Sequence, residues 1–277
     1  MIPYDFDYYR PTSIQEALTI YQTLKHAGRK PMYFSGGTEI ITLGRVNWVY
    51  TDAVIDLKGI PEYHVLFKSE SRLILGAGLS LVQIEEANPF PLLSKTASEI
   101  ADHTARTKIT LGGNICAQIF YREAVLPFLL SDSLMVVAMH DGMKIFPIHE
   151  IFSKCLCLNE GDFLIQVSTD QKFVEAPSIS IKRRKQWNTG YPLLTAAALK
   201  VDGAIRLAIS GLCPFPFRAF EIEELLNHSD LSMEEKINGA VERLPSPILN
   251  DVEGSAEYRL FVLKNTLIDI LQELGKE

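Results

Sequence analysis

The sequence of 277 residues has few cysteines and no long apolar run, and each shortage excludes a class of protein. Its four cysteines, Cys116, Cys155, Cys157 and Cys213, are too few and too scattered for a disulfide framework, a zinc site or an iron–sulfur cluster. No apolar stretch approaches the roughly 20 residues that span a bilayer, and the N-terminus lacks the features of a signal peptide. We therefore expect a cytoplasmic protein without a membrane span.

Positive charge is scarce as well. The sequence carries 27 Lys and Arg against 34 Asp and Glu, which gives a net charge of -7 at pH 7. This balance argues against nucleic acid as a partner, because phosphate contacts need clustered basic side chains. One basic cluster, residues 181–187, is open to two interpretations: a site for a phosphate or an acidic partner, or a solvated hairpin end.

Familiar catalytic motifs are missing too. The sequence has no G-x-x-x-x-G-K-[ST] loop, no G-x-S-x-G elbow and no H-E-x-x-H pair. Residues 76–81 begin like a dinucleotide-binding fingerprint but end in Leu81 instead of glycine. None of the six histidines has the setting of a catalytic base, and His103 is typical of a helix end.

The periodicity of apolar residues divides the chain into parts. With 47% hydrophobic residues the chain can bury a sizeable core, and its length suits two domains. Residues 1–57 predict a small α/β unit, with a helix capped by Thr12 or Ser13 and strands at 31–34 and 53–57. Residues 58–172 predict strands at 72–78, 134–139, 143–148 and 162–168, and helices at 81–87 and 92–103.

After residue 172 the predicted strands and helices are segregated. Strands come first, at 178–183, 193–201 and 205–212, and Asp202-Gly203 is a hairpin turn signal. Helices follow at 219–228, 232–244 and 255–275. This order predicts a C-terminal α+β domain at 173–277, preceded by a domain at 1–172 with subdomains of about 1–57 and 58–172.

Two glycine loops have nearly the same pattern, "SGGTE" at 35–39 and "TLGGN" at 110–114. Successive backbone N–H groups can hold a phosphate in such a loop, because glycine allows close approach and positive φ angles. A helix that follows the loop would add its dipole. The two loops predict one ligand that is held at two points. The alternative is a pair of tight turns that only the fold needs.

These loops and the segments around them resemble the FAD-binding medium subunit of molybdenum hydroxylases, such as xanthine dehydrogenases and carbon monoxide dehydrogenase. The resemblance covers nearly the whole chain. It rests on the order and spacing of five segments: "FDYYRPTSIQEAL" (6–18), "SGGTEI" (35–40), "LILGAGLSL" (73–81), "TLGGNICA" (110–117) and "FPFRAFEIEELL" (215–226).

The resemblance implies a fold and a cofactor. The fold is α+β, a two-subdomain FAD-binding domain of the vanillyl-alcohol-oxidase (PCMH) type followed by a smaller C-terminal α+β domain. The family holds the FAD pyrophosphate between the two glycine loops. The residues implied in FAD binding are Met32, Tyr33, Phe34, Ser35, Gly36, Gly37, Thr38, Glu39, Thr110, Leu111, Gly112, Gly113, Asn114, Glu123 and Lys182. In the family, residues at the last two positions approach the flavin or its ribityl chain.

Some positions depart from the family pattern near the flavin. Ala117 replaces a polar residue, and Glu123 replaces the usual aspartate. Tyr191 stands where aspartate is usual, and the flavin-facing tyrosine of some relatives aligns with Pro192. These changes leave the pyrophosphate loops intact and alter the expected surroundings of the flavin ring.

The resemblance implies an electron-transfer subunit with no catalytic residue of its own. A partner subunit with molybdopterin would oxidise the substrate, with xanthine as the family's first candidate, and another with [2Fe–2S] clusters would relay electrons. FAD on this chain would pass them to NAD or another acceptor. Two alternatives stay open: a single-chain FAD reductase of the same fold, or a degenerate member that serves only in assembly.

Overall fold

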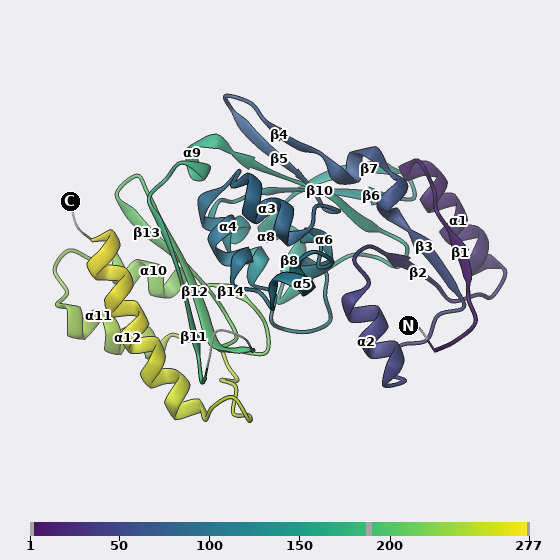
Figure 1. Ribbon diagram of the computed structural model, residues 1–277. Coiled ribbons are helices and arrows are strands. Elements are labelled where there is room, and N and C mark those ends of the chain that lie inside the picture. Colours follow the sequence, from purple (N-terminus) through teal and green to yellow (C-terminus); the bar gives the residue numbers. More distant parts are fainter. Residues whose placement is uncertain (1–2, 187–189, 276–277) are drawn as a thin grey trace.

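The computed structural model describes residues 3–186 and 190–275 and shows three units in a row (Figure 1). The N-terminal unit lies at one end, a five-stranded sheet with its helices lies in the middle, and a four-stranded sheet with three further helices lies at the other end. No described helix is both long and apolar enough to cross a membrane.

The N-terminal unit is a small parallel sheet with two helices. Its strands are β1 (Asp7–Tyr9), β2 (Pro31–Phe34) and β3 (Ala53–Asp56), in the order β1-β3-β2. Its helices are α1 (Ile14–His26) and α2 (Thr38–Arg45). Ser13, one of the two caps that the sequence left open, caps α1 by accepting the N–H of Glu16. Strand β1 was not predicted, because its three residues are mostly exposed and show no apolar alternation.

The middle unit is built on an antiparallel sheet in the order β4-β5-β10-β6-β7. Its strands are β4 (Leu66–Lys68), β5 (Arg72–Gly76), β6 (Leu134–Met139), β7 (Gly142–Pro147) and β10 (Phe163–Asp170). Short elements fill the connections: α3 (Leu81–Ala87), α4 (Pro91–Ser98), α5 (His103–Arg106), α6 (Leu111–Ile115), α7 (Leu126–Leu130), α8 (Ile148–Ile151), β8 (Phe152–Ser153), β9 (Cys155–Leu156), α9 (Gln171–Val174) and the 3₁₀ turns Leu57–Gly59, Pro61–His64 and Glu123–Val125.

One predicted helix in this unit is wrong in its extent. The sequence predicted a single helix over 92–103, whereas α4 ends at Ser98 and α5 begins only at His103. Ala101 between them has φ of +50°, in the left-handed region, and Asp102 caps the second helix by accepting the N–H of Ala105. Asp102, one residue before the end of the predicted helix, therefore caps a new helix and divides the segment.

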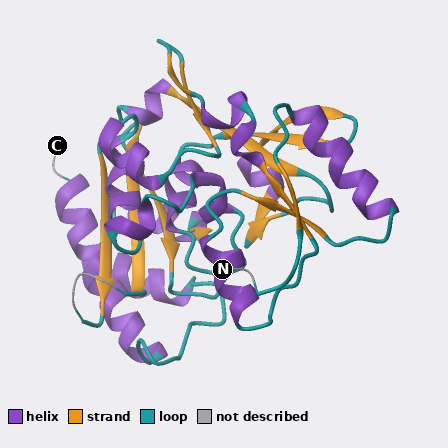
Figure 2. Cartoon of the chain, turned by 45° about the vertical axis from the view of Figure 1, so that its right-hand side comes forward, coloured by secondary structure: helices purple, strands orange, loops and turns teal. Residues whose placement is uncertain are grey.

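The C-terminal unit follows the predicted order of strands and then helices. Strands β11 (Ser178–Arg184), β12 (Pro192–Val201), β13 (Ala204–Ser210) and β14 (Phe217–Arg218) form a sheet in that order, and α10 (Phe220–Leu226), α11 (Met233–Glu242) and α12 (Ala256–Leu274) follow. The sheet lies between layers of helices (Figure 2): α10 and α12 contact one side, and α4 and α7 contact the other.

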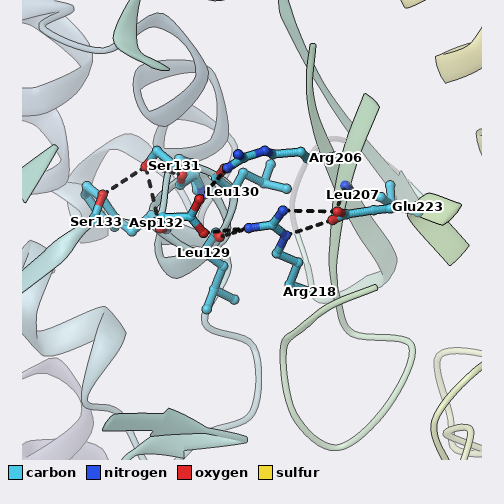
Figure 3. A network of polar contacts seen from close by, with 11 residues as sticks. Leu129, Leu130, Ser131, Asp132, Ser133, Arg206, Leu207, Arg218 and Glu223 are labelled. Carbon is cyan, nitrogen blue, oxygen red and sulfur yellow. Dashed lines mark hydrogen bonds and ion pairs between the residues drawn. The ribbon is translucent and has the colours of Figure 1, made fainter. Parts of the chain in front are cut away.

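The middle and C-terminal units share a core and a polar network. Ala197, Leu199, Val201 and Ala208 of the C-terminal sheet belong to the same apolar cluster as the middle unit. Beside them, Asp132 in the turn after α7 accepts from Arg206 at 2.6 Å and from Arg218 at 2.7 Å. Arg218 also pairs with Glu223 of α10 (Figure 3). The two parts of the chain are therefore tightly joined. We propose that the domains are 1–172 and 173–277.

Candidate functional site

The structure brings the two glycine loops into direct contact. The hydroxyl oxygens of Ser35 and Thr110 lie 2.9 Å apart. A Cβ atom at Gly36 would lie 1.8 Å from the carbonyl oxygen of Lys108, two residues before the second loop. Only glycine fits at position 36 while the loops stay together, so this glycine is required by the contact between the loops themselves.

The first loop leaves backbone N–H groups available. Gly37 has φ of +72° and is the N-cap residue of α2, with no side chain to cap the helix. The N–H groups of Thr38, Glu39 and Ile40 are in the first helical turn, where no intrahelical acceptor exists, and no described residue accepts them. An anion at this point would meet free N–H groups and the positive end of the helix dipole.

The second loop has its N–H groups occupied. Leu111 donates to the carbonyl of Leu79 and Gly112 to that of Ala77, both at 2.8 Å. Gly113 donates to the Thr110 hydroxyl at 3.2 Å. These bonds fasten α6 to the start of α3 and the end of β5. The part of this loop that faces solvent is Gly113, where a Cβ atom would meet only the Thr110 side chain.

The residues of β2 that lead into the first loop point to different sides. Tyr33 stacks on Tyr21, packs against Phe163 with the two rings tilted, and donates to the carbonyl of Gly161, so its side chain faces the interior. The ring of Phe34 packs against Gly37. Met32 is half-buried. Of these three side chains, only that of Phe34 adjoins the first loop. The backbone at the end of β2 also adjoins it.

Lys58 supplies a positive charge at the first loop, and sequence reasoning missed it. Its Nζ donates to the carbonyl of Ser35 at 2.9 Å and to Asp56 at 2.7 Å, and it lies 4.5 Å from the centroid of the Phe34 ring. Burial acts to raise the pKa of Asp56, but the bonds from Lys58 and Tyr8 outweigh it and hold that pKa below its ordinary value. Lys58 lies in the 3₁₀ turn after β3 and belongs to no sequence motif that would identify it.

Glu39 ties the first loop to the segment after the second. Its carboxylate accepts the N–H of Gln118 at 2.9 Å and that of Ile119 at 2.8 Å. This carboxylate was a candidate cofactor ligand, and the structure shows both of its oxygens engaged with backbone. Glu39 therefore holds α2 against the chain that follows α6.

Glu123 and Lys182, both candidate flavin ligands, are paired with each other. Their side chains are each 3% exposed, and Lys182 Nζ lies 2.7 Å from a carboxylate oxygen of Glu123 and 2.7 Å from the carbonyl of Glu99. The amide oxygen of Asn114 accepts the N–H of Ala124 and so links the second loop to this pair. The pair joins the middle unit to β11, and within the described residues neither side chain forms a hydrogen bond with the glycine loops.

The described part of the basic cluster is engaged within the chain. Arg183 pairs with Asp269, Arg184 donates to the carbonyl of Glu99, and Lys185 donates to that of Val252. Trp187, at the end of the predicted cluster, lies outside the described residues. The hairpin-end interpretation thus fits better than a free phosphate site.

Tyr121 and Tyr191 form an aromatic wall at the edge of the junction between the middle and C-terminal units. Their rings are nearly parallel, with centroids 4.4 Å apart, and Tyr191 remains 51% exposed. Burial raises the pKa of Tyr121 to about 12. Burial, followed by the charges of Glu123 and Glu39, also raises the pKa of Tyr191. The departure at position 191 therefore places a neutral ring close to the acidic candidates.

Two cavities lie away from the glycine loops. One of about 340 Å³ lies beside α1 and is lined by residues such as Tyr21, His140 and Glu160. Another of about 270 Å³ lies beside Lys154, Phe215 and Arg218. The free N–H groups at the start of α2 make the first loop the better candidate for an anion site.

The arrangement fits a phosphate-containing ligand at the first loop. Three free N–H groups, the dipole of α2 and the ammonium group of Lys58 all favour negative charge there. The Gly113 surface offers a second bare stretch of backbone across the loop contact. No described group of three or more His, Cys, Asp or Glu residues is suited to a metal ion.

Comparison with known proteins supports a flavin ligand. Residues 4–169 match the family described as the FAD binding domain in molybdopterin dehydrogenase. The chain is 25% identical to the nicotinate dehydrogenase FAD-subunit of Eubacterium barkeri, over 98% of this chain and 97% of that protein. It is 30% identical to the carbon monoxide dehydrogenase medium chain of Hydrogenophaga pseudoflava, over 79% and 78%.

Solved structures agree with the fold. Carbon monoxide dehydrogenase from Hydrogenophaga pseudoflava superposes with a TM-score of 0.88 at 20% identity, over 99% of each chain. This likeness confirms the predicted α+β architecture of the FAD-binding type.

Proposed function

This chain belongs to the family of FAD binding domains in molybdopterin dehydrogenases, and on that premise we propose that it is an electron-transfer subunit. It would receive electrons from iron–sulfur clusters of a partner subunit and pass them to an acceptor, with NAD as the first candidate. FAD, when bound, supplies the redox chemistry, and the protein supplies binding, orientation and electrostatics.

The first loop carries the proposal for how the cofactor is held. The N–H groups of residues 38–40 and the Lys58 ammonium group would hold the pyrophosphate of FAD, because together they offer free donors and positive charge. Ser35, Gly36, Gly37 and Thr38 form this cradle. The second loop would contribute the bare surface of Gly113 and the position of Thr110, while Leu111 and Gly112 act as its supports.

The junction between the units is the proposed flavin region. Tyr191 is exposed beside the buried Glu123–Lys182 pair, where the middle unit meets β11 and β12. A planar ring could pack against the Tyr121–Tyr191 wall there, and the buried pair would set the local field. The Tyr191 hydroxyl is protonated at pH 7, as an ordinary tyrosine is, so it can donate a hydrogen bond.

Partner subunits are part of the proposal. The chain covers nearly the full length of a relative named as an FAD-subunit and most of one named as a medium chain, and both names denote parts of larger enzymes. A large subunit with molybdopterin and a small subunit with [2Fe–2S] clusters would complete the enzyme. Oxidation of substrate would take place on the large subunit.

The substrate of the complex is proposed from relatives alone. Proteins named as xanthine dehydrogenase FAD-binding subunit and caffeine dehydrogenase subunit beta are among them, beside those named for nicotinate and carbon monoxide. We keep xanthine as the candidate and place it in the wider class of nitrogen heterocycles. None of the described residues of this chain is expected to touch it.

The test of electron transfer uses the FAD-loaded chain and then the complex. NADH added without oxygen should bleach the visible flavin absorption if NAD is the acceptor, since the reaction is reversible. Co-purification with both partners, followed by assays with xanthine, caffeine and nicotinate, would identify the substrate. A loaded chain that NADH does not bleach would exclude NAD, and a chain that recruits no partner would contradict the subunit role.

A further inference from the structure

Arg122 has a buried side chain without an acidic partner. It lies immediately before Glu123 and is 6% exposed, and no ion pair joins it to a described residue. Burial, its largest influence, lowers the pKa of this guanidinium, although Cys155 and Glu39 act in the opposite direction. An unpaired charge in a protein interior is unfavourable, so its hydrogen bonds must compensate for lost hydration.

Three carbonyl oxygens from two separate segments surround the guanidinium. Nε donates to the carbonyl of Ala117 at 2.7 Å, and Nη2 donates to that of Gln118 at 3.3 Å. Nη1 reaches across to the carbonyl of Lys154 at 2.6 Å. Lys154 is the turn residue between β8 and β9 and has φ of +66°. Arg122 therefore fastens the segment after the second glycine loop to a turn far away in the sequence.

Glu39 holds the same segment from its N–H side. The carboxylate accepts from Gln118 and Ile119, while the guanidinium donates to the carbonyls of Ala117 and Gln118. The peptide groups of residues 117–119 are thus fixed on both polar faces, by a cation on one and an anion on the other. Because Glu39 belongs to the first turn of α2, this arrangement also fixes the start of α2, where the free N–H groups lie.

We propose that Arg122 is a positioning residue for the cofactor site, acting through residues 117–119 and Glu39 on the first glycine loop. This inference rests on the proposed binding of FAD. The guanidinium is needed for its shape, since three donors must reach three acceptors in fixed directions. A lysine at this position keeps the charge, but its three donors share one nitrogen, so they cannot reproduce the three positions from which the guanidinium donates.

The experiment compares the full-length chain with its Arg122→Lys and Arg122→Gln variants. In hydrogen exchange of the FAD-free protein, the amides of Gln118 and Ile119 should exchange at least tenfold faster in Arg122→Lys. Residues 117–119 would no longer be fixed by the guanidinium, so their hydrogen bonds to the Glu39 carboxylate would open more often. FAD affinity, measured by quenching of flavin fluorescence, should fall at least tenfold. Arg122→Gln removes the buried charge, makes smaller demands on the fold, and should show the same two effects.

A matched control and a double variant separate positioning from general damage. Arg206→Lys changes an arginine that also donates to a carbonyl, that of Leu130, but lies away from the loops, so FAD affinity should stay within twofold of wild type. Glu39→Gln combined with Arg122→Lys should weaken binding by less than the product of the two single effects, since both act on the same peptides.

The outcomes distinguish this inference from the proposed function. Wild type that binds FAD, with folded Arg122 variants that bind it equally well and exchange residues 118 and 119 at the wild-type rate, would overturn the role of Arg122 alone. Full rescue by Arg122→Lys would also overturn it, because the charge would then be sufficient. Wild type that binds no FAD would refute the proposed function, while the exchange rates would still decide whether Arg122 fixes this segment.

Discussion

The two glycine loops look alike in sequence and differ in what their backbones do. At the first loop, α2 begins without a side-chain cap and leaves the N–H groups of residues 38–40 free. At the second, the N–H groups of residues 111–113 are bonded to Leu79, Ala77 and Thr110. We propose that the first loop receives an anion and that the second loop holds the first loop in place. A Gly-Gly pattern alone does not separate these roles; an account of each N–H group does.

The largest expected effect comes from a substitution at the contact between the two loops. We expect Gly36→Ala to abolish FAD retention, because its Cβ atom would lie 1.8 Å from the carbonyl of Lys108 and force the loops apart. Overpacking of this kind typically costs about 1–3 kcal/mol of stability. The flavin-to-protein ratio and the urea midpoint would measure both effects. A folded Gly36→Ala protein with wild-type flavin content would contradict the loop geometry.

The supporting role of the second loop predicts a change in stability more than in binding. Thr110→Val removes the cap on Gly113 and the contact with Ser35, and should lower the free energy of unfolding by about 1 kcal/mol. FAD affinity should fall only a few fold. Thermal unfolding and fluorescence titration, run on the same preparation, would show this. A large loss of affinity with unchanged stability would mean that the second loop binds the anion itself.

A matched pair of lysines tests the charge at each loop. Lys58→Met removes the ammonium group beside the first loop and should weaken FAD binding roughly five-fold, with a smaller dependence on salt, since a surface-proximal charge contributes on the order of 1 kcal/mol. Lys108→Met, at the second loop, leaves the backbone carbonyl in place and should change affinity less than twofold. Equal effects of the two substitutions would remove the asymmetry between the loops.

The smallest effect concerns Cys116, directly after α6. Part of this residue is exposed, but burial around its sulfur raises the pKa of the thiol to about 12. Alkylation by iodoacetamide needs the thiolate, so the rate at Cys116 should stay low at pH 8 and rise only as the pH approaches that pKa. Peptide mass spectrometry, with Cys116→Ser as the reference, would follow it. Rapid alkylation at pH 8 would show that the second loop is more open than described.

The raised pKa of Tyr121 predicts how the stability of the folded chain changes at alkaline pH. Tyr121 is neutral in the folded chain up to a pKa of about 12, whereas an unfolded tyrosine ionises near 10. The unfolded state therefore loses its proton first, and stability should fall as pH rises from about 10 to 12. Tyr121→Phe should make this fall shallower in thermal melts, and an identical slope in both proteins would count against the buried hydroxyl.

Much of the fold was predictable from periodicity and caps. The helix over 14–26, the hairpin at Asp202-Gly203 and the order of elements after residue 172 were all confirmed, because their patterns are long and their turn residues specific. Strand β1 and the break between α4 and α5 were not predicted, because the first is short and exposed and the second depends on one local cap.

The site was predictable in its loops and not in its supports. Glycine pairs are visible in sequence, and the structure brings them together. Lys58, Arg122 and the mutual pairing of Glu123 and Lys182 depend on contacts between segments far apart in the chain, which no local pattern encodes. Xanthine as substrate and NAD as acceptor were family expectations, and the relatives named for nicotinate, caffeine and carbon monoxide leave them as proposals.

The most direct measurement is a titration of the FAD-free chain with FAD, read by calorimetry and by the visible spectrum of the product. We expect one FAD per chain for wild type, with binding that weakens as salt rises and is lost in Gly36→Ala. A wild-type protein that stays colourless after purification and takes up no added FAD would contradict it, and would reduce both glycine loops to turns of the fold.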